Sequence, residues 1–276
     1  MRFRHRSLRK DTRAITPAIS TVVITGTVVA LLLVTIVFAN NFLDARIAEN
    51  EYSSGKQFML TTGLQVDDVA WTIGRTQTVR YSSRYGHVKF ESSVLNYTFE
   101  VTPSSGPSVN YTTGVILFNM PTSIITYGNN YFERIFPSND SFLLSGSSVP
   151  VSHVFAVEKL PMVDGSYTRI VVAPSLRMLN SIVGETTYVK FFLPSLNEGS
   201  NLHLSQSITL TGDDIDKVTI NNVMQVRITV AFPSASQGYD STFFNFESLS
   251  EIVDVPEGSV VELYVGKVIV SLGLHT

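Results

Sequence analysis

The sequence predicts an α+β protein: a long N-terminal transmembrane helix followed by a predominantly antiparallel, β-sandwich-like extracellular domain. Two observations predict this fold class. No charged residue occurs between Arg13 and Asp44, and an uncharged, mostly apolar stretch of that length is typical of a helix that spans a membrane. Beyond residue 76, segments that alternate apolar and polar residues are separated by turns rich in Gly, Pro, Ser and Asn, which is typical of antiparallel strands.

The apolar stretch is long enough to cross a bilayer. With a rise of about 1.5 Å per helical residue, residues 18–39 span a hydrocarbon core of about 30 Å. Thr16 and Pro17 predict the helix start, because a threonine hydroxyl caps free amides and proline fits the first turn. The polar residues of the stretch have hydroxyl groups that can bond back to helix carbonyls; they are mainly Ser20, Thr21, Thr25, Thr27 and Thr35.

The distribution of charge predicts the orientation in the membrane. Six of the 20 basic residues but only one of the 23 acidic residues precede Ala14, which leaves 14 basic and 22 acidic residues and a net charge of −8. Since basic flanks stay on the cytoplasmic side, we expect a single-pass protein with a cytoplasmic N-terminus. The lipid bilayer is then a partner, whereas the acidic remainder offers no electrostatic surface for nucleic acid.

These patterns divide the chain into four segments. They are a basic leader (1–14), the transmembrane helix (15–43), a helical extension or stalk (44–76) and the β-rich domain (77–276). Ser53-Ser54-Gly55 predicts a kink or break in the stalk. After it, a second helical stretch from Gln57 to Ile73 is expected to pack one face against a core, formed by Leu60, Leu64, Val69 and Ile73.

Several strands and turns of the β-rich domain can be predicted individually. Alternation predicts strands at 168–172, 187–191, 224–230 and 261–265. Hairpin turns are expected at 83–86 and at 164–165, and Gly266 is expected to form a bulge. The loop-like segment 102–110 is expected to separate two sheet subassemblies.

The residues provide few candidates for chemistry. Cysteine is absent, which excludes disulfides, thiol nucleophiles and zinc–thiolate sites. The five histidines have no metal-binding spacing, and no nucleophile motif occurs. We therefore expect no catalytic residues, no cofactor and no enzymatic activity. A weak candidate for a cation site is Asp213, Asp214 and Asp216, although the segment lacks the glycine and distal glutamate of an EF-hand and an acidic turn is the favoured alternative.

Two surface features point to modification or binding. Three N-x-S/T sequons make Asn96, Asn110 and Asn139 candidates for N-glycosylation in an extracellular domain. An aromatic and polar patch is typical either of a carbohydrate-binding surface or of a sheet core with its turn; it consists of Tyr127, Asn129, Asn130, Tyr131, Phe132 and Phe136.

The junction Arg13-Ala14-Ile15-Thr16-Pro17-Ala18-Ile19, followed by the Val-, Leu- and Thr-rich helix, resembles the N-terminus of archaeal type IV pilins and pilin-like proteins. The resemblance implies a class III signal peptide that prepilin peptidase cuts between Ala14 and Ile15. Arg13 and Ala14 would be recognised, and Ile15 would become the mature N-terminus. Bacterial pilins carry glutamate at the fifth mature position, where this chain has Ile19, so the match is with the archaeal members.

The resemblance covers the leader and the helix alone. It implies a membrane-anchored structural or adhesive subunit of a type IV pilus-like filament, or a protein associated with one, with other pilin-like subunits as partners. A cut before the helix would retain the anchor, whereas an ordinary secretory signal has an apolar core of about 7–15 residues and is removed with it. The alternative is an unprocessed single-pass protein whose extracellular β-sandwich binds a ligand or partner.

Overall fold

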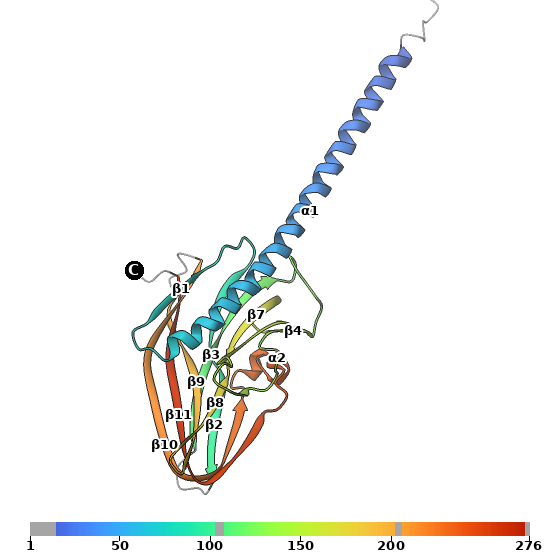
Figure 1. Ribbon diagram of the computed structural model, residues 1–276. Helices are drawn as coiled ribbons and strands as arrows, with labels where there is room; N and C mark the ends of the chain where they lie inside the picture. The colour runs from blue at the N-terminus through green and yellow to red at the C-terminus, as the bar shows by residue number, and fades with distance from the viewer. Residues whose placement is uncertain (1–14, 103–107, 202–205, 274–276) are drawn as a thin grey trace, which may run out of the picture. The chain divides into compact units, whose positions relative to one another are not determined.

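The computed structural model describes residues 15–102, 108–201 and 206–273, with the side chains of 15–18 and 201 left out. The helices are α1 (Ile15–Ala70), the short 3-10 helix η1 (Ala235–Gln237) and α2 (Ser241–Phe244). The strands are β1 (Thr76–Arg80), β2 (His87–Thr102), β3 (Val109–Pro121), β4 (Tyr131–Phe136), β5 (Leu143–Ser145), β6 (Ser152–Glu158), β7 (Tyr167–Pro174), β8 (Leu176–Val183), β9 (Thr186–Asn201), β10 (Ser207–Ala231) and β11 (Ser250–Leu272). One long helix followed by mostly strands confirms the predicted α+β class (Figure 1).

The chain forms two compact units, residues 1–47 and 48–276. The helix α1 contributes residues to both, and it continues through Ser53, Ser54 and Gly55, where the sequence predicts a kink or break. Residues 48–70 belong to the unit that contains the sheet, and α1 runs as far as Ala70 through the segment 44–76, where the sequence predicts a helical extension or stalk.

The strands form one continuous sheet in the order β4-β6-β7-β3-β2-β10-β11-β9-β8-β5, and β1 also pairs with β10. Most neighbours are antiparallel, but β9 and β11 are parallel, as are β5 and β8. The strands β2 and β3 pair from His87–Asn119 to Phe99–Val109. The expectation that 102–110 separates two subassemblies is therefore wrong; residues 103–107 themselves lie outside the described ranges.

The sheet is buried on both faces, as β3 shows. Ile116 and Phe118 point to one face, where they join a cluster beneath α1 that we name the helix-side core. Val115 and Leu117 point to the other face and join a second cluster, the inner core, to which α2 also contributes. Because β2, β3, β6 and β7 meet β9, β10 and β11 in the inner core, the sheet must curve around it.

Residues 48–70 of α1 cross one face of the sheet (Figure 1). Tyr52, Met59 and Val66 are at most 2 % exposed and recur every seven residues, a spacing that returns to the same side of a helix. Gly55 and Gly63 lie against the sheet, where a Cβ would come within 2.8 Å of side-chain atoms of β3 and β6. Small residues thus allow the helix to approach the strands closely.

The prediction of the helix face that packs against the core is wrong; it is based on Leu60, Leu64, Val69 and Ile73. Val69 is buried, but Leu64 is 49 % exposed and Ile73, which follows the end of α1, is 63 % exposed. With 3.6 residues per turn, Val69 lies half a turn around the helix from Leu60, so these residues cannot share one face.

The end of α1 lies against two glycines on neighbouring strands. A Cβ on Gly266 of β11 would collide with the carbonyl oxygen of Ala70, and one on Gly212 of β10 would collide with the carbonyl oxygens of Val69 and Thr72. The register of β11 passes through Gly266 without a shift, so the predicted bulge is wrong there. Glycine is needed at this position because the helix backbone approaches so closely.

The predicted strands 168–172, 187–191, 224–230 and 261–265 lie within β7, β9, β10 and β11. The hairpin expected at 83–86 is wrong, because β1 pairs with β10 and β2 pairs with β3 and β10. The strands β6 and β7 do pair around 164–165, but their connection spans residues 159–166 and is longer than a two-residue turn.

Replacing Gly266 by alanine should lower the free energy of unfolding by about 1–3 kcal/mol, because the new methyl group meets a backbone oxygen that no side-chain rotation can move. Trp71 is the single tryptophan of the chain and follows α1 directly, so its fluorescence during urea unfolding of the full chain in lipid nanodiscs measures the effect. Thr219→Ala, at an exposed position of β10, is the control and should change stability by less than about 0.5 kcal/mol. Equal stability of the two variants would contradict the close approach of the Ala70 carbonyl to Gly266.

Candidate functional sites

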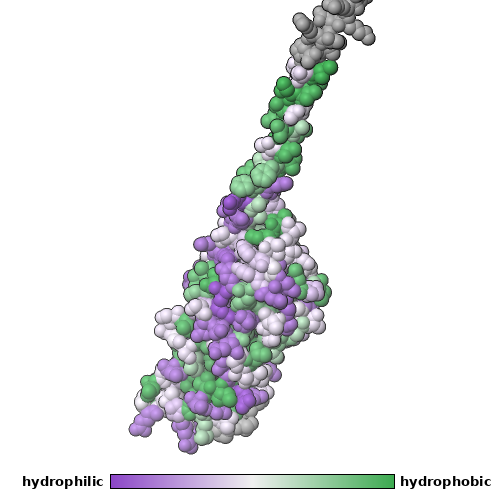
Figure 2. Space-filling view, turned by 90° about the vertical axis from the view of Figure 1, so that its right-hand side faces the viewer, coloured by the Kyte–Doolittle hydropathy of each residue, from purple (hydrophilic) through white to green (hydrophobic). Residues whose placement is uncertain are grey.

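The first candidate is the apolar part of α1 in the first unit. Its large side chains are exposed, Ile19 to 58 % and Phe38 to 72 %, and they account for much of the green surface of this stretch in Figure 2. Thr25, Thr27 and Thr35 each donate to a carbonyl oxygen four residues earlier at 2.8 Å, as predicted. Among the described residues, α1 is the helix long and apolar enough to cross a membrane. The hydroxyl groups of Thr25, Thr27 and Thr35 are satisfied within the helix, as hydrocarbon requires.

The predicted processing junction lies at the edge of the described chain. Arg13 and Ala14 lie outside the described residues, and α1 begins at Ile15. The side chains of Thr16 and Pro17 are likewise outside the description, so the helix start expected from them stays a prediction.

The structure divides the aromatic and polar patch between the two faces of β4. On the helix side, Tyr127 and Tyr131 stack with ring centroids 4.6 Å apart, and Tyr52 of α1 lies 5.3 Å from Tyr127. Glu133 accepts hydrogen bonds from the Tyr131 hydroxyl and, at 2.5 Å, from Lys56. Burial acts to raise the pKa of Glu133, but these two donors outweigh it and hold that pKa below its usual value.

The rest of the patch faces the other way or supports the turn. Phe132 packs against the inner core, with its ring 5.2 Å from that of Phe155, whereas Phe136 is half-buried. The Asn129 side chain accepts hydrogen bonds from the amides of Asn130 and Leu160 at 3.0 and 2.8 Å. These contacts leave Asn129 with a structural role.

A buried ionic network joins β2 and β7 to the β6–β7 connection and to the segment before α2. The sequence patterns do not indicate it. Arg169 of β7 is completely buried. Its guanidinium donates to Asp164 at 2.5 Å, to the Gly165 carbonyl at 3.4 Å and to the Met162 sulfur at 2.9 Å. In the sequence, Arg169 looks like an ordinary polar position of an alternating strand, and only its proximity to Asp164-Gly165 could have suggested a charge pair.

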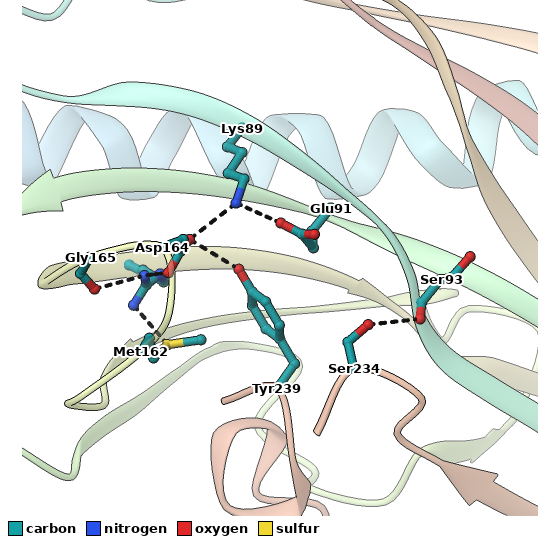
Figure 3. Close-up of polar contacts among 9 residues, drawn as sticks. Lys89, Glu91, Ser93, Met162, Asp164, Gly165, Ser234 and Tyr239 are labelled. Carbon is teal, nitrogen blue, oxygen red and sulfur yellow. Dashed lines mark hydrogen bonds and ion pairs between the residues drawn. The ribbon is translucent and has the colours of Figure 1, made fainter. Parts of the chain in front are cut away.

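Asp164 also joins this network to β2 and to the segment before α2 (Figure 3). It accepts hydrogen bonds from Lys89 and from the Tyr239 hydroxyl, both at 3.2 Å, and Lys89 also pairs with Glu91 at 2.6 Å. Burial, followed by the charge of Asp164, raises the pKa of Tyr239. The two acids and two bases balance one another, and the network joins elements that are far apart in the sequence, so we assign it to stability.

The aspartate candidate for a cation site is organised around a lysine. Asp214 and Asp216 both pair with Lys267, at 3.2 and 2.9 Å, and Asp213 is exposed within the register shift that follows Gly212. In the described ranges, no three His, Asp or Glu side chains come together in a way that could hold a metal ion. The ion pairs argue against a cation site, but the acidic-turn alternative is also wrong, because the three aspartates lie within β10 at a register shift.

The three sequons differ in accessibility. Asn110 and Asn139 are exposed, whereas Asn96 is half-buried and its Oδ1 atom is buried without a hydrogen-bond partner. Asn96 lies opposite Thr112, and Thr98 lies opposite Asn110, so two sequons share one patch of the β2–β3 surface. Asn139 accepts a hydrogen bond from the Ser141 amide at 2.7 Å in a separate turn.

A buried histidine lies beside the inner core. His153 is completely buried; its Nε2 atom lies 3.0 Å from the Ser141 carbonyl and its Nδ1 atom 3.3 Å from Arg134. Since the carbonyl must accept and the guanidinium must donate, the neutral tautomer carries its proton on Nε2. Burial, followed by the charge of Arg134, lowers the pKa of His153 to about 4, although the Ser141 carbonyl and Asp140 oppose that shift.

No protein-family model, curated protein or solved structure matches this chain.

The stability of the sheet domain should fall as the pH decreases from about 6.5 to about 4, because the unfolded chain binds a proton at His153 that the folded chain does not. The full pKa difference corresponds to about 3 kcal/mol. Urea unfolding at a series of pH values measures it. His153→Gln, which keeps a donor and an acceptor, should remove this slope while leaving the loss below about pH 4 that arises from paired carboxylates. A slope that persists in the variant would contradict the assignment.

Asp164→Ala should destabilise the domain by about 3–5 kcal/mol, because Arg169 would stay buried without its carboxylate. The matched control is Asp68→Ala, which removes a half-exposed pair with Arg75 and should change stability by less than about 1 kcal/mol. Thermal unfolding of both variants tests the difference. Similar melting temperatures for the two would show that the network has no such role.

Proposed function

We propose that this chain is a pilin-like, membrane-anchored surface protein that forms, or associates with, a type IV pilus-like filament. The observation that carries the proposal is the position of the uncharged, exposed part of α1 directly behind the basic leader and the pair Arg13-Ala14. In this proposal prepilin peptidase removes residues 1–14, and Ile15 becomes the mature N-terminus. The role is structural and adhesive.

Retention of the helix gives it two uses. Before assembly it anchors the chain in the bilayer, because its apolar side chains are exposed and the hydroxyls of Thr25, Thr27 and Thr35 are bonded to its own backbone. In a filament, the same side chains pack against the helices of neighbouring subunits. Gly26 and Ala30 lie one turn apart, and the space around Gly26 is open, which favours close contact with a second helix.

The acidic remainder of the chain then lies outside the cell, and its sheet forms a sandwich-like domain. The basic leader supports this orientation because such flanks stay on the cytoplasmic side. Cysteine is absent, so the domain depends on its two cores in place of disulfides. Glycans on Asn110 and Asn139, both exposed, are compatible with this location.

The alternative is a single-pass protein that keeps its leader and uses the sheet domain to bind a ligand or partner. The observation in its favour is that residues 48–276 form a compact unit with two cores of their own. Such a domain does not require a filament to fold.

The mature N-terminus distinguishes the two functions. When the chain is co-expressed with an archaeal prepilin peptidase, the purified protein should begin at Ile15, as intact-mass and N-terminal peptide measurements can show. Arg13→Glu and Ala14→Asp should each block cleavage, because they change the residues next to the bond that is cut. Arg9→Glu is the control, since it alters the leader charge away from the junction and should leave cleavage intact. A retained Met1 or Arg2 in the wild-type protein would exclude processing.

A further inference from the structure

A cavity of about 250 Å³ lies where β4 and β6 meet α2, on the inner-core side of the sheet. Its apolar lining comes from Phe132 and Val157. Its polar lining comes from Asn130 and Tyr131 at the start of β4, Glu158 and Lys159 at the end of β6, and Thr242 and Asn245 at α2. Segments more than 80 residues apart in the sequence therefore converge on one small hollow, as the 2.8 Å hydrogen bond from Lys159 to Thr242 shows directly.

The two charged residues that line this cavity, Glu158 and Lys159, already have partners within the protein. Lys159 pairs with Asp240 at 2.5 Å. The Glu158 carboxylate accepts hydrogen bonds from the Thr126 hydroxyl, the Tyr127 amide and the Thr168 hydroxyl at 2.7, 2.8 and 2.7 Å. A charged ligand would have to displace these partners, so neither Lys159 nor Glu158 is free to pair with an anion or a cation.

Two carboxamides remain available to a ligand. Asn130 and Asn245 both line the cavity and both have left-handed backbones, with φ of +70° and +50°. In the described part of the chain, neither carboxamide forms a hydrogen bond with another protein group, although their backbone groups do. Each carboxamide has an NH2 group that donates and a carbonyl oxygen that accepts. A ligand hydroxyl group both donates and accepts, so it can form hydrogen bonds with both parts of the carboxamide.

From this arrangement we propose that the cavity binds one neutral sugar ring. A sugar presents C–H groups to apolar side chains and hydroxyl groups to carboxamides, and this lining provides both. Ligand pockets usually measure about 300–1,000 Å³, so this smaller cavity suits a single ring and not a large cofactor. The rest of a glycan chain would extend into solvent.

The proposal goes beyond the filament function and does not depend on cleavage of the leader. A failure to bind sugar would leave the N-terminal processing result unchanged, and a retained leader would leave the cavity unchanged. The two proposals can therefore fail separately.

Saturation-transfer NMR on the full chain tests the proposal, with methyl glycosides of glucose, galactose, mannose and N-acetylglucosamine as probes. Lipid nanodiscs are needed, because detergents with sugar headgroups would compete for the site. At least one neutral glycoside should bind with a dissociation constant in the millimolar range, as expected for a few hydrogen bonds and one small apolar contact. If none of the four binds, or if the charged probe methyl glucuronide binds more tightly than all of them, the proposal is overturned.

Glycine substitutions separate binding from folding. Asn130→Gly and Asn245→Gly each delete a carboxamide, and glycine tolerates the left-handed backbone. Each should weaken binding about threefold to tenfold, as expected for one hydrogen bond, without loss of the folded sheet. Asn222→Gly is the matched control, because Asn222 is also left-handed, with φ of +59°, and lies in β10 away from the cavity. Equal binding by the double variant Asn130→Gly/Asn245→Gly and the control would overturn the assignment to this cavity.

Discussion

The close packing of residues 48–70 of α1 on the sheet is the constraint on which the rest of the domain depends. Glycines occur on both sides of this contact: Gly55 and Gly63 on the helix, and Gly212 and Gly266 on the strands. A Cβ would meet side-chain atoms of the strands at Gly55 and Gly63 and backbone atoms of the helix end at Gly212 and Gly266. Val66, Val69 and Ala70 are almost completely buried. Because the helix covers one face, β3, β6 and β7 must bury apolar residues on both faces. The long strands then extend beyond the helix to enclose the second core.

The inner core is stabilised by polar groups as well as by aromatic packing. Arg169 and Asp164 connect β7 with β2 and with the segment that carries Tyr239, and His153 connects β6 with the segment before β5. In a protein without disulfides, such contacts fix connections that apolar packing alone would leave less specific. Buried charges of this kind need all of their partners, so the network favours a single arrangement of the loops.

The same helix meets two different requirements along its length. From residue 19 to residue 43 it is uncharged and exposed on all sides, as suits a helix surrounded by lipid or by other helices. From residue 48 onward only one side is apolar and buried, and charged residues such as Lys56 and Asp67 pair with the strands. None of the residues that line the cavity proposed to bind sugar belongs to α1, so binding there does not compete with the helix contact.

The sequence by itself determined the long apolar helix and the positions of individual strands, because both depend on local composition and periodicity. It did not determine which face of the helix packs, since Leu64 and Val69 are equally apolar and only the shape of the sheet selects between them. Nor did it determine the partners of β1, the need for glycine at 266 or the Arg169–Asp164 pair. The cavity at Asn130 and Asn245 was likewise decided by tertiary structure alone. Each of these features joins residues distant in the chain, and local periodicity contains no information about which distant segments meet.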